Sequence, residues 1–172
     1  MSRLLVISDI KISLCDDKFY LESQYYYIIE RYYKNFGKLD IIARCKKVDS
    51  VENLNIAPFF NDVINVSFLD CLFNAKTKRK VSKVIENADL IAMREPSIIC
   101  SLFYKKIRKQ KKKVLAELMG DAWDAYANHG LLGKLIAPYM HQSTKKIMKE
   151  ANYALYVTNE YLQKKYPASC KS

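Results

Sequence analysis

Short apolar runs and helical repeats alternate along this chain of 172 residues. The apolar runs predict buried strands. We expect them at residues 3–9, 39–45, 63–68, 89–94, 113–118 and 153–158. Between them, apolar side chains recur at steps of three and four residues, which predicts amphipathic helices. We expect these helices at residues 23–36, 75–88, 98–109, 131–150 and 160–166.

Single residues mark several of the expected boundaries. Gly37 is suited to ending the first helix, while Ser97 and Asn159 are suited to starting the third and the last. Pro138 is expected to break or kink the fourth helix, because proline removes a backbone donor. Residues 10–22 are expected to form a polar, irregular connection.

The alternation of strands and helices sets the fold class. Several strands are continuous apolar runs, which is typical of strands covered on both faces. The sequence therefore predicts an α/β fold, with a doubly wound, mostly parallel Rossmann-like sheet of about six or seven strands and helices on both faces. No internal repeat or linker interrupts it, and residues 167–172, PASCKS, look like the start of a connection.

The charge balance adds an expectation about partners. The formal net charge is +11, which predicts an anionic partner such as nucleic acid, phospholipid headgroups or a phosphorylated substrate. No apolar run approaches the ~18 residues that span a bilayer, and the N-terminus resembles a first strand rather than a signal peptide. Five scattered cysteines are expected to be free thiols in a reducing cytosol, so we expect a cytoplasmic protein.

Polar residues gather where the expected strands end. In an open α/β sheet, ligands bind beyond the carboxyl ends of the strands. The candidate binding residues at these ends are Asp9, Asp16, Asp17, Arg94, Glu95, Glu117, Gly120, Thr158 and Asn159. The stretch 117–130, ELMGDAWDAYANHG, also holds Asp121, the chain's one Trp (Trp123) and His129. Short polar residues at strand ends are also ordinary turn chemistry, and Trp123 could simply pack over the sheet edge.

Common catalytic and cofactor signatures are absent from the sequence. It contains no GxGxxG or GxxxxGK[ST] phosphate loop, no GxSxG nucleophile elbow and no HExxH zinc motif. The cysteines form no CxxC pair, and two histidines are too few to complete a zinc cluster with them. We therefore expect neither a metal nor a cofactor.

A dense basic run follows the third expected helix. It carries seven cations, at Lys105, Lys106, Arg108, Lys109, Lys111, Lys112 and Lys113. These cations can complement the helix dipole, but seven exceed what a helix end needs. The run therefore predicts contact with an anionic surface, either a membrane leaflet or nucleic acid.

The helix expected at 131–150 carries a broad apolar side. Its apolar residues are Leu131, Leu132, Leu135, Ile136, Tyr139 and Met140. This pattern is typical of a core helix, and it also fits an interfacial amphipathic helix with Lys145, Lys146 and Lys149 beyond the apolar side.

Four stretches, in this order and spacing, resemble the N-terminal, acceptor-side domain of family 4 glycosyltransferases of GT-B fold, of the bacterial polysaccharide-assembly type. They are ERYYKNFGKLDIIAR (30–44), ADLIAMREPS (88–97), LAELMGDAWDAYANHG (115–130) and ANYALYVTNEYLQKKYP (151–167). The resemblance implies that residues 1–167 form this domain and that residues 168–172 begin the interdomain connection. The donor-binding C-terminal domain would then lie outside this chain.

The resemblance also implies a reaction and site residues. The family transfers a sugar from a nucleotide-activated donor to an acceptor hydroxyl, and the acceptor here is expected to be a lipid-linked saccharide. The donor would be a co-substrate held mainly by the missing domain, so this half alone should be inactive. A carboxylate or imidazole can deprotonate the acceptor. Asp121 is the first candidate base and His129 the second, and Asp121→Asn should lower turnover with little change in Tm.

Other roles follow from the same resemblance. Arg94 and Glu117 could hydrogen-bond acceptor hydroxyls or diphosphate, and Trp123 could stack on a sugar ring. Family members often have a Gly-rich loop after the first strand, whereas residues 10–18 contain no glycine, which leaves Asp16 and Asp17 as polar candidates. The basic run would dock the domain peripherally on the inner face of the cell membrane.

Two alternatives from other classes stay open. A basic α/β nucleic-acid-binding module would explain the net charge, although acids at the strand ends would repel phosphate. A non-catalytic subunit that recruits a split glycosyltransferase to the membrane would share the fold and the basic run, but it would not need Asp121 or His129.

Overall fold

The computed structural model describes residues 3–170, and the chain divides after Asp89 into two compact units. The first unit contains β1 (Leu4–Cys15), β2 (Lys18–Glu22), α1 (Ser23–Phe36), β3 (Leu39–Lys47), β4 (Leu54–Ile56), β5 (Phe60–Asn65), α2 (Phe68–Phe73) and α3 (Ala75–Asn87). The second contains β6 (Leu90–Glu95), α4 (Ile98–Lys109), β7 (Lys113–Leu118), α5 (Ala122–Ala127), α6 (Gly130–Glu150), β8 (Tyr153–Tyr156) and α7 (Tyr161–Lys165). Residues 171 and 172 of the expected connection lie outside the described residues.

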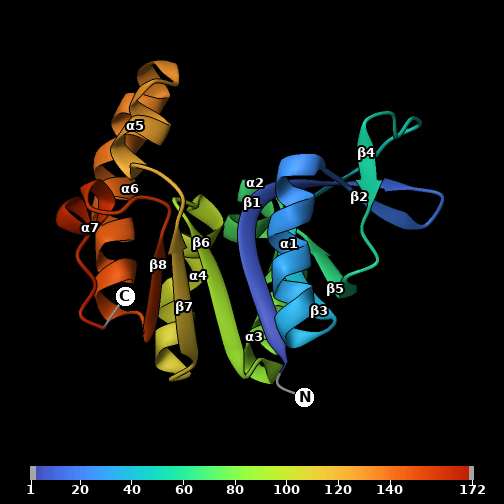
Figure 1. Ribbon diagram of the computed structural model, residues 1–172, viewed down its shortest axis with the longest axis horizontal. Helices are drawn as coiled ribbons and strands as arrows, with labels where there is room; N and C mark the ends of the chain where they lie inside the picture. Colours follow the sequence, from blue (N-terminus) through green and yellow to red (C-terminus); the bar gives the residue numbers. More distant parts are fainter. Residues whose placement is uncertain (1–2, 171–172) are drawn as a thin grey trace. The chain divides into compact units, whose positions relative to one another are not determined.

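The strands of the first unit form both parallel and antiparallel pairs. β3 pairs in parallel with β1 and β5, whereas β2 pairs antiparallel with β1 and β4. The first residues of β1, Leu4–Ile7, are all fully buried, so both faces of this strand are covered. Figure 1 shows α1 in front of β1 and β3, with α2 and α3 behind them.

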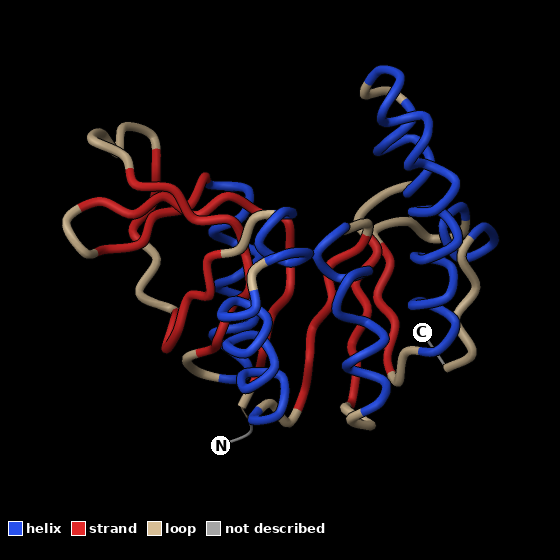
Figure 2. The backbone as a smooth tube through the Cα atoms, turned by 180° about the vertical axis from the view of Figure 1, so that it is seen from behind, coloured by secondary structure: helices blue, strands red, loops and turns tan. Residues whose placement is uncertain are grey.

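The expected irregular connection at residues 10–22 is wrong. β1 continues to Cys15, and after a two-residue turn β2 runs back beside it, as the long strands at the left of Figure 2 show. The reason lies in the sequence, where Ile10, Ile12 and Leu14 alternate with polar residues, the pattern of a half-buried strand. The pairing of β1 with β3 shifts register between Ile7 and Lys11, so Asp9 lies at an irregularity rather than at a strand end.

Helix caps explain where the helices of the first unit begin and end. Gly37 ends α1 as predicted, with φ 76° and its amide donating to Tyr33 O at 2.8 Å. The short helix α2 was not predicted, although Ser67 and Asp70 form a capping box at its start. Asn74 then caps α3 by accepting from the Thr77 amide at 3.1 Å.

The second unit is a parallel sheet flanked by helices. β7 pairs in parallel with β6 and β8. Ser97 caps α4 as predicted, because its Oγ accepts from the Cys100 amide at 3.1 Å. Thr158, rather than the predicted Asn159, supports α7 by accepting from the Leu162 amide at 3.1 Å.

Helices α5 and α6 follow β7 and pack against each other; Figure 1 shows the loop from β7 leading up to α5. α5 was not predicted as a separate helix. A side chain at Gly133 would collide with the backbone oxygen of Tyr126, so a residue without Cβ is required for this close packing. Pro138 was predicted to break or kink this helix. It lies inside α6 and does not end it, so the break is wrong, whereas the kink stays a prediction.

The α/β class is confirmed, with eight strands and seven helices among residues 3–170. The prediction of a mostly parallel sheet is only partly correct, because β2 and β4 add antiparallel pairs. β2 lies in residues 10–22, which were expected to be an irregular connection, and β4 lies between the strands expected at residues 39–45 and 63–68, where no strand was predicted.

Candidate functional site

The carboxyl ends of β6 and β7 carry a buried ion pair. Arg94 and Glu117 are opposite each other in the parallel register, and the Arg94 Nε donates to the Glu117 Oε2 at 2.9 Å. Both side chains are 5% exposed. The predicted site residues Arg94 and Glu117 therefore lie together, but they bind each other within the protein rather than project freely into a pocket.

Glu95 points to the opposite side of β6, because successive strand residues alternate between faces. It is 1% exposed. Its Oε2 accepts from the Ser97 amide at 3.2 Å and from the Thr144 Oγ1 of α6 at 3.0 Å. Glu95 thus ties the end of β6 to α4 and α6.

Asp121 is the centre of a polar cluster at the start of α5. Its Oδ1 accepts from the Trp123 amide at 2.8 Å, which caps the helix, and from the Tyr166 hydroxyl at 2.7 Å. Its Oδ2 accepts from the Tyr161 hydroxyl at 2.8 Å and from the Lys165 ammonium group. We call these residues, Asp121, Tyr161, Lys165 and Tyr166, the Asp121 clamp.

The clamp sets the charge state of its members. Burial alone would raise the pKa of Asp121, but the four donors outweigh it and hold that pKa well below its ordinary value. The hydrogen bond to Asp121 raises the pKa of Lys165. Asp121 is therefore a stable carboxylate with both oxygens occupied, and such a group is a weak proton acceptor. This geometry favours a structural role for Asp121 over the predicted role of a base.

The clamp continues to His141 of α6. The Tyr166 hydroxyl lies 2.9 Å from the His141 Nδ1. A tyrosine hydroxyl has one proton, which Tyr166 donates to the acceptor-only carboxylate of Asp121, so Nδ1 must carry the proton shared with Tyr166. In the neutral ring, Nε2 then holds the lone pair. Burial lowers the pKa of His141, and the cations Lys165 and Lys145 lower it further.

Trp123 lies beside this imidazole. Its side chain is 43% exposed, and its ring meets the His141 ring edge-to-face with centroids 6.4 Å apart. The sequence therefore placed Asp121 and Trp123 in one cluster correctly, but it missed His141. Gly120 precedes the cluster, and a side chain there would meet open space.

His129 and Asn159 lie outside the clamp. Both are exposed, and His129 stands at the start of α6 without a side-chain capping bond. Thr158 is partly buried, and its hydroxyl serves the start of α7. The predicted role of these residues toward a substrate stays a prediction.

The candidates from the first unit gather at the tip of the β1–β2 hairpin. Asp16 and Asp17 form its two-residue turn, with φ 45° and 57°. They line a cavity of about 360 Å³ together with Lys47 and Asp49. Asp9 lies within β1, where its backbone oxygen accepts from the Arg44 guanidinium.

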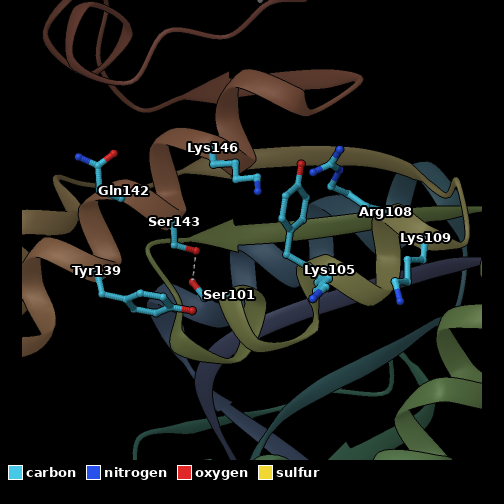
Figure 3. Close-up of a pocket in the computed structure, with 9 residues that line it drawn as sticks. Ser101, Lys105, Arg108, Lys109, Tyr139, Gln142, Ser143 and Lys146 are labelled. Atoms are coloured by element: carbon cyan, nitrogen blue, oxygen red, sulfur yellow. Dashed lines mark hydrogen bonds between the residues drawn. The ribbon is translucent and has the colours of Figure 1, made fainter.

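The basic run ends α4 and continues into β7. Lys105, Arg108 and Lys109 line a groove between α4 and α6 with a volume of about 680 Å³, and Lys146 of α6 joins them. Figure 3 shows these side chains around the groove, together with the hydrogen bond from Ser143 to Ser101 at 2.8 Å. The other members of the run, Lys106, Lys111, Lys112 and Lys113, do not line it.

The first half of α6 exposes its apolar side. Leu131, Leu132 and Leu135 are 82%, 75% and 76% exposed, whereas the core face of the helix consists of other residues, including Ala137 and Met140. The interpretation of the whole apolar side as a core face is therefore wrong. Within residues 3–170, no helix has the length and hydropathy to cross a membrane, and no three His, Cys, Asp or Glu side chains group as metal ligands.

Comparison with known proteins yields one informative similarity. No family model matches the chain. The chain is 31% identical to Protein CapJ of Staphylococcus aureus over an alignment of 181 positions. The alignment covers 98% of this chain and 45% of that protein, so the chain spans less than half the length of this relative.

The site residues that were not predicted from the sequence come from α7, from Tyr166 directly after it, and from α6. Tyr161, Lys165 and Tyr166 reach Asp121 across 40 or more positions of the chain, and His141 joins through Tyr166. From its neighbours in the sequence, Asp121 was predicted to be a candidate base or part of a turn, and its distant hydrogen-bond donors were not foreseen. The stretch YLQKKY (161–166) does hold a signal, because it places two tyrosines and two lysines shortly after the end of the chain's last strand.

Proposed function

We propose that this chain supplies the acceptor-binding half of a glycosyltransferase that acts in the synthesis of a bacterial surface polysaccharide, such as a capsule. The observation that carries the proposal is the similarity to Protein CapJ along 98% of the chain. The name of that relative suggests a capsule-related role. The four stretches that resemble family 4 glycosyltransferases support the same reaction class.

In this proposal the donor and the acceptor bind to different halves. A nucleotide-activated sugar binds mainly to a donor half outside these 172 residues, and that half is joined in the same chain or supplied by a partner subunit. The present half orients a saccharide acceptor, which is lipid-linked. It contributes no cofactor of its own.

The Asp121 clamp gives this half a place for the acceptor. Trp123 offers an exposed indole face, and sugar rings stack on such faces through their C–H bonds. The buried pair Arg94 and Glu117 supports the sheet edge beneath it rather than touching the sugar. His129 and Asn159 remain available as exposed hydrogen-bonding groups.

The proton acceptor in this proposal is His141 rather than Asp121. The chain of hydrogen bonds from Asp121 through Tyr166 fixes the proton on Nδ1 of His141 and leaves the lone pair on Nε2. Because burial and neighbouring cations lower its pKa, the ring is neutral at pH 7 and can accept a proton. His129 is the second candidate.

The proposed sugar transfer conserves atoms and electrons, and it needs neither a metal nor a redox partner. The acceptor oxygen forms a bond to the anomeric carbon of the donor sugar, and the bond from that carbon to the phosphate oxygen breaks. The nucleoside diphosphate leaves with the electron pair. The hydroxyl proton passes to Nε2 of His141.

The test uses the complete enzyme, with both halves present. It is incubated with a panel of nucleotide-activated sugars and lipid-linked saccharides extracted from the source membranes. Nucleoside diphosphate release and labelling of the lipid fraction are measured. We expect transfer with one donor, and we expect His141→Ala to lower kcat by about 10²-fold or more, the usual contribution of a general base.

The pH profile separates a base from a structural residue. For the wild type, kcat/KM should fall as the pH drops through the pKa of His141, which lies below the ordinary histidine value. His141→Ala should lose that inflection, whereas His129→Ala, the variant of the second candidate, should keep it. Loss of the inflection in His129→Ala alone would move the role of proton acceptor to His129. An unchanged profile in His141→Ala would remove His141 from the role. Absence of transfer with every donor, despite retained acceptor binding, would favour a non-catalytic subunit.

A further inference from the structure

The groove between α4 and α6 has the chemistry of a phosphate site. Its lining includes the cations Lys105, Arg108, Lys109 and Lys146, with hydroxyl groups between them. No carboxylate lines it among the described residues. Glu150 binds the Arg108 Nε at 3.0 Å from beyond the lining, so it offsets only part of this charge.

The apolar end of α6 lies on the same helix face as the groove. Leu131, Leu135, Tyr139, Gln142 and Lys146 follow one another at steps of three and four residues, which places them in one stripe along the helix. Tyr139, Gln142 and Lys146 line the groove. With a rise of 1.5 Å per residue, the stripe extends over about 22 Å from the leucines to the lysine.

The leucines of this stripe contribute little to the core. Leu131 and Leu135 are 82% and 76% exposed, and Leu132 beside them is 75% exposed. Contiguous apolar side chains that are this exposed commonly mark a contact surface. A face that is apolar in its first half and cationic in its second matches the boundary between acyl chains and anionic headgroups.

We propose that this face docks on an anionic phospholipid membrane, with the leucines of α6 among the acyl chains and lipid phosphates in the α4–α6 groove. The occupant follows from charge and polarity together. Nucleic acid would satisfy the cations but would leave the leucines in water. A neutral protein partner would satisfy the leucines but not the cations. The docking site does not depend on the proposed glycosyl transfer.

The test measures sedimentation of the 172-residue chain with vesicles. One set contains phosphatidylcholine only, and the other contains phosphatidylcholine with about 30% phosphatidylglycerol, which gives a moderately anionic surface. We expect clear binding to the anionic set and weak binding to the neutral set. Raising the salt concentration should weaken the binding, because surface charges are screened.

Charge reversal tests the groove. Lys105→Glu with Lys146→Glu should lower the partition onto anionic vesicles by at least about 25-fold, since loss of each basic residue near such a surface contributes roughly a fivefold change and the two new carboxylates add repulsion. The matched control is Lys76→Glu with Lys83→Glu on the exposed side of α3. Each double reversal lowers the formal net charge of +11 by four, to +7, so general electrostatics is held constant. The control should change the partition less than about threefold.

Polar substitution tests the leucines. Leu131→Ser with Leu135→Ser should weaken binding by about tenfold or more, because burial of a leucine side chain in an apolar phase is worth at least that much. Leu69→Ser with Phe73→Ser on α2 is the control, because these side chains are 63% and 78% exposed in the first unit. All four positions are exposed, so the variants should fold, and far-UV circular dichroism checks this.

Three outcomes would overturn the proposal. The first is equal binding to neutral and anionic vesicles, and the second is an equal effect of the groove and control reversals. The third is absence of vesicle binding with tight, salt-sensitive binding of DNA or RNA that the groove variant abolishes. If the complete enzyme shows no glycosyl transfer while this chain still binds anionic vesicles, the proposed reaction is refuted and the proposed docking site stands.

Discussion

The Asp121 clamp predicts that Asp121→Asn destabilises the fold. Asparagine keeps the shape of the side chain, and its oxygen can still accept from the Trp123 amide, so the helix cap survives. The replaced oxygen becomes an amide nitrogen, which cannot accept from the Tyr161 hydroxyl or from Lys165. The variant therefore loses the two interactions of Oδ2 and weakens the bond from Tyr166.

The magnitude follows from burial and charge. The Asp121 side chain is 5% exposed, whereas that of Lys165 is 34% exposed. A hydrogen bond to a charged group contributes about 1.5–3 kcal/mol, and we discount the two lost bonds because Tyr161 and Lys165 can turn toward water. The expected loss in the free energy of unfolding is about 3 kcal/mol. In a chain of this size, that lowers Tm by about 6–12 °C.

The assay is urea and thermal unfolding at pH 7, repeated at lower pH. The pKa of Asp121 is lowered in the folded state. The Asp121 carboxylate therefore contributes fully to the free energy of unfolding above the pKa of about 3.9 that an aspartate has in the unfolded chain. This contribution is lost as the pH falls toward the pKa of Asp121 in the folded protein. The gap between wild type and Asp121→Asn should therefore stay constant from about pH 8 to pH 5 and narrow below about pH 4.

The control is Asp124→Asn, which removes one charge from an exposed position in the first turn of α5. It should change the free energy of unfolding by less than about 0.5 kcal/mol. An Asp121→Asn variant as stable as this control would refute the clamp. It would also restore Asp121 as a candidate base, for which turnover falls while Tm does not.

Two further variants test the packing that supports the site. Arg94→Met should lower the free energy of unfolding by about 3–5 kcal/mol in urea, because it removes the cation that forms an ion pair with the buried Glu117. Adding Glu117→Leu should recover most of that loss, and a single variant as stable as the double variant would contradict this. Gly133→Ala should lower the free energy of unfolding by about 1–3 kcal/mol, since the new methyl group meets the Tyr126 backbone oxygen. The control in the same thermal melt is Gly120→Ala, because a side chain at Gly120 meets open space.

The sequence predicted best those elements whose signals are local. The helix at residues 23–36 was predicted at its observed bounds, because Gly37 marks its end and its apolar side chains recur at helical steps. The cap at Ser97 and the strand at residues 113–118 were confirmed for the same reason. The strand end predicted at Asp9 was wrong, because this charged residue lies inside β1.

The site depends on contacts that sequence spacing does not encode. The donors that saturate Asp121 come from α7 and the residue after it, and the tautomer of His141 depends on Tyr166. A local pattern around Asp121 predicts a polar cluster, and it cannot tell a base from a saturated carboxylate. The exposure of Leu131 and Leu135 could not be predicted either, because amphipathic periodicity does not say which apolar residues pack in the core.

The three-residue length of β4 bears on self-association at high concentration. A strand at the margin of a sheet can recruit a strand from another molecule through its unpaired amide and carbonyl groups. β4 pairs with β2 through Leu54–Ile56 only, and Asn53 before it, with φ 62°, turns the backbone out of the extended conformation. Because this edge strand is so short, it offers the backbone of an incoming strand too few hydrogen-bonding groups for the sheet to continue into a second molecule. At this margin, a basic chain with several exposed leucines thereby gains protection against fibre-like stacking, a property of practical value when it is concentrated for study.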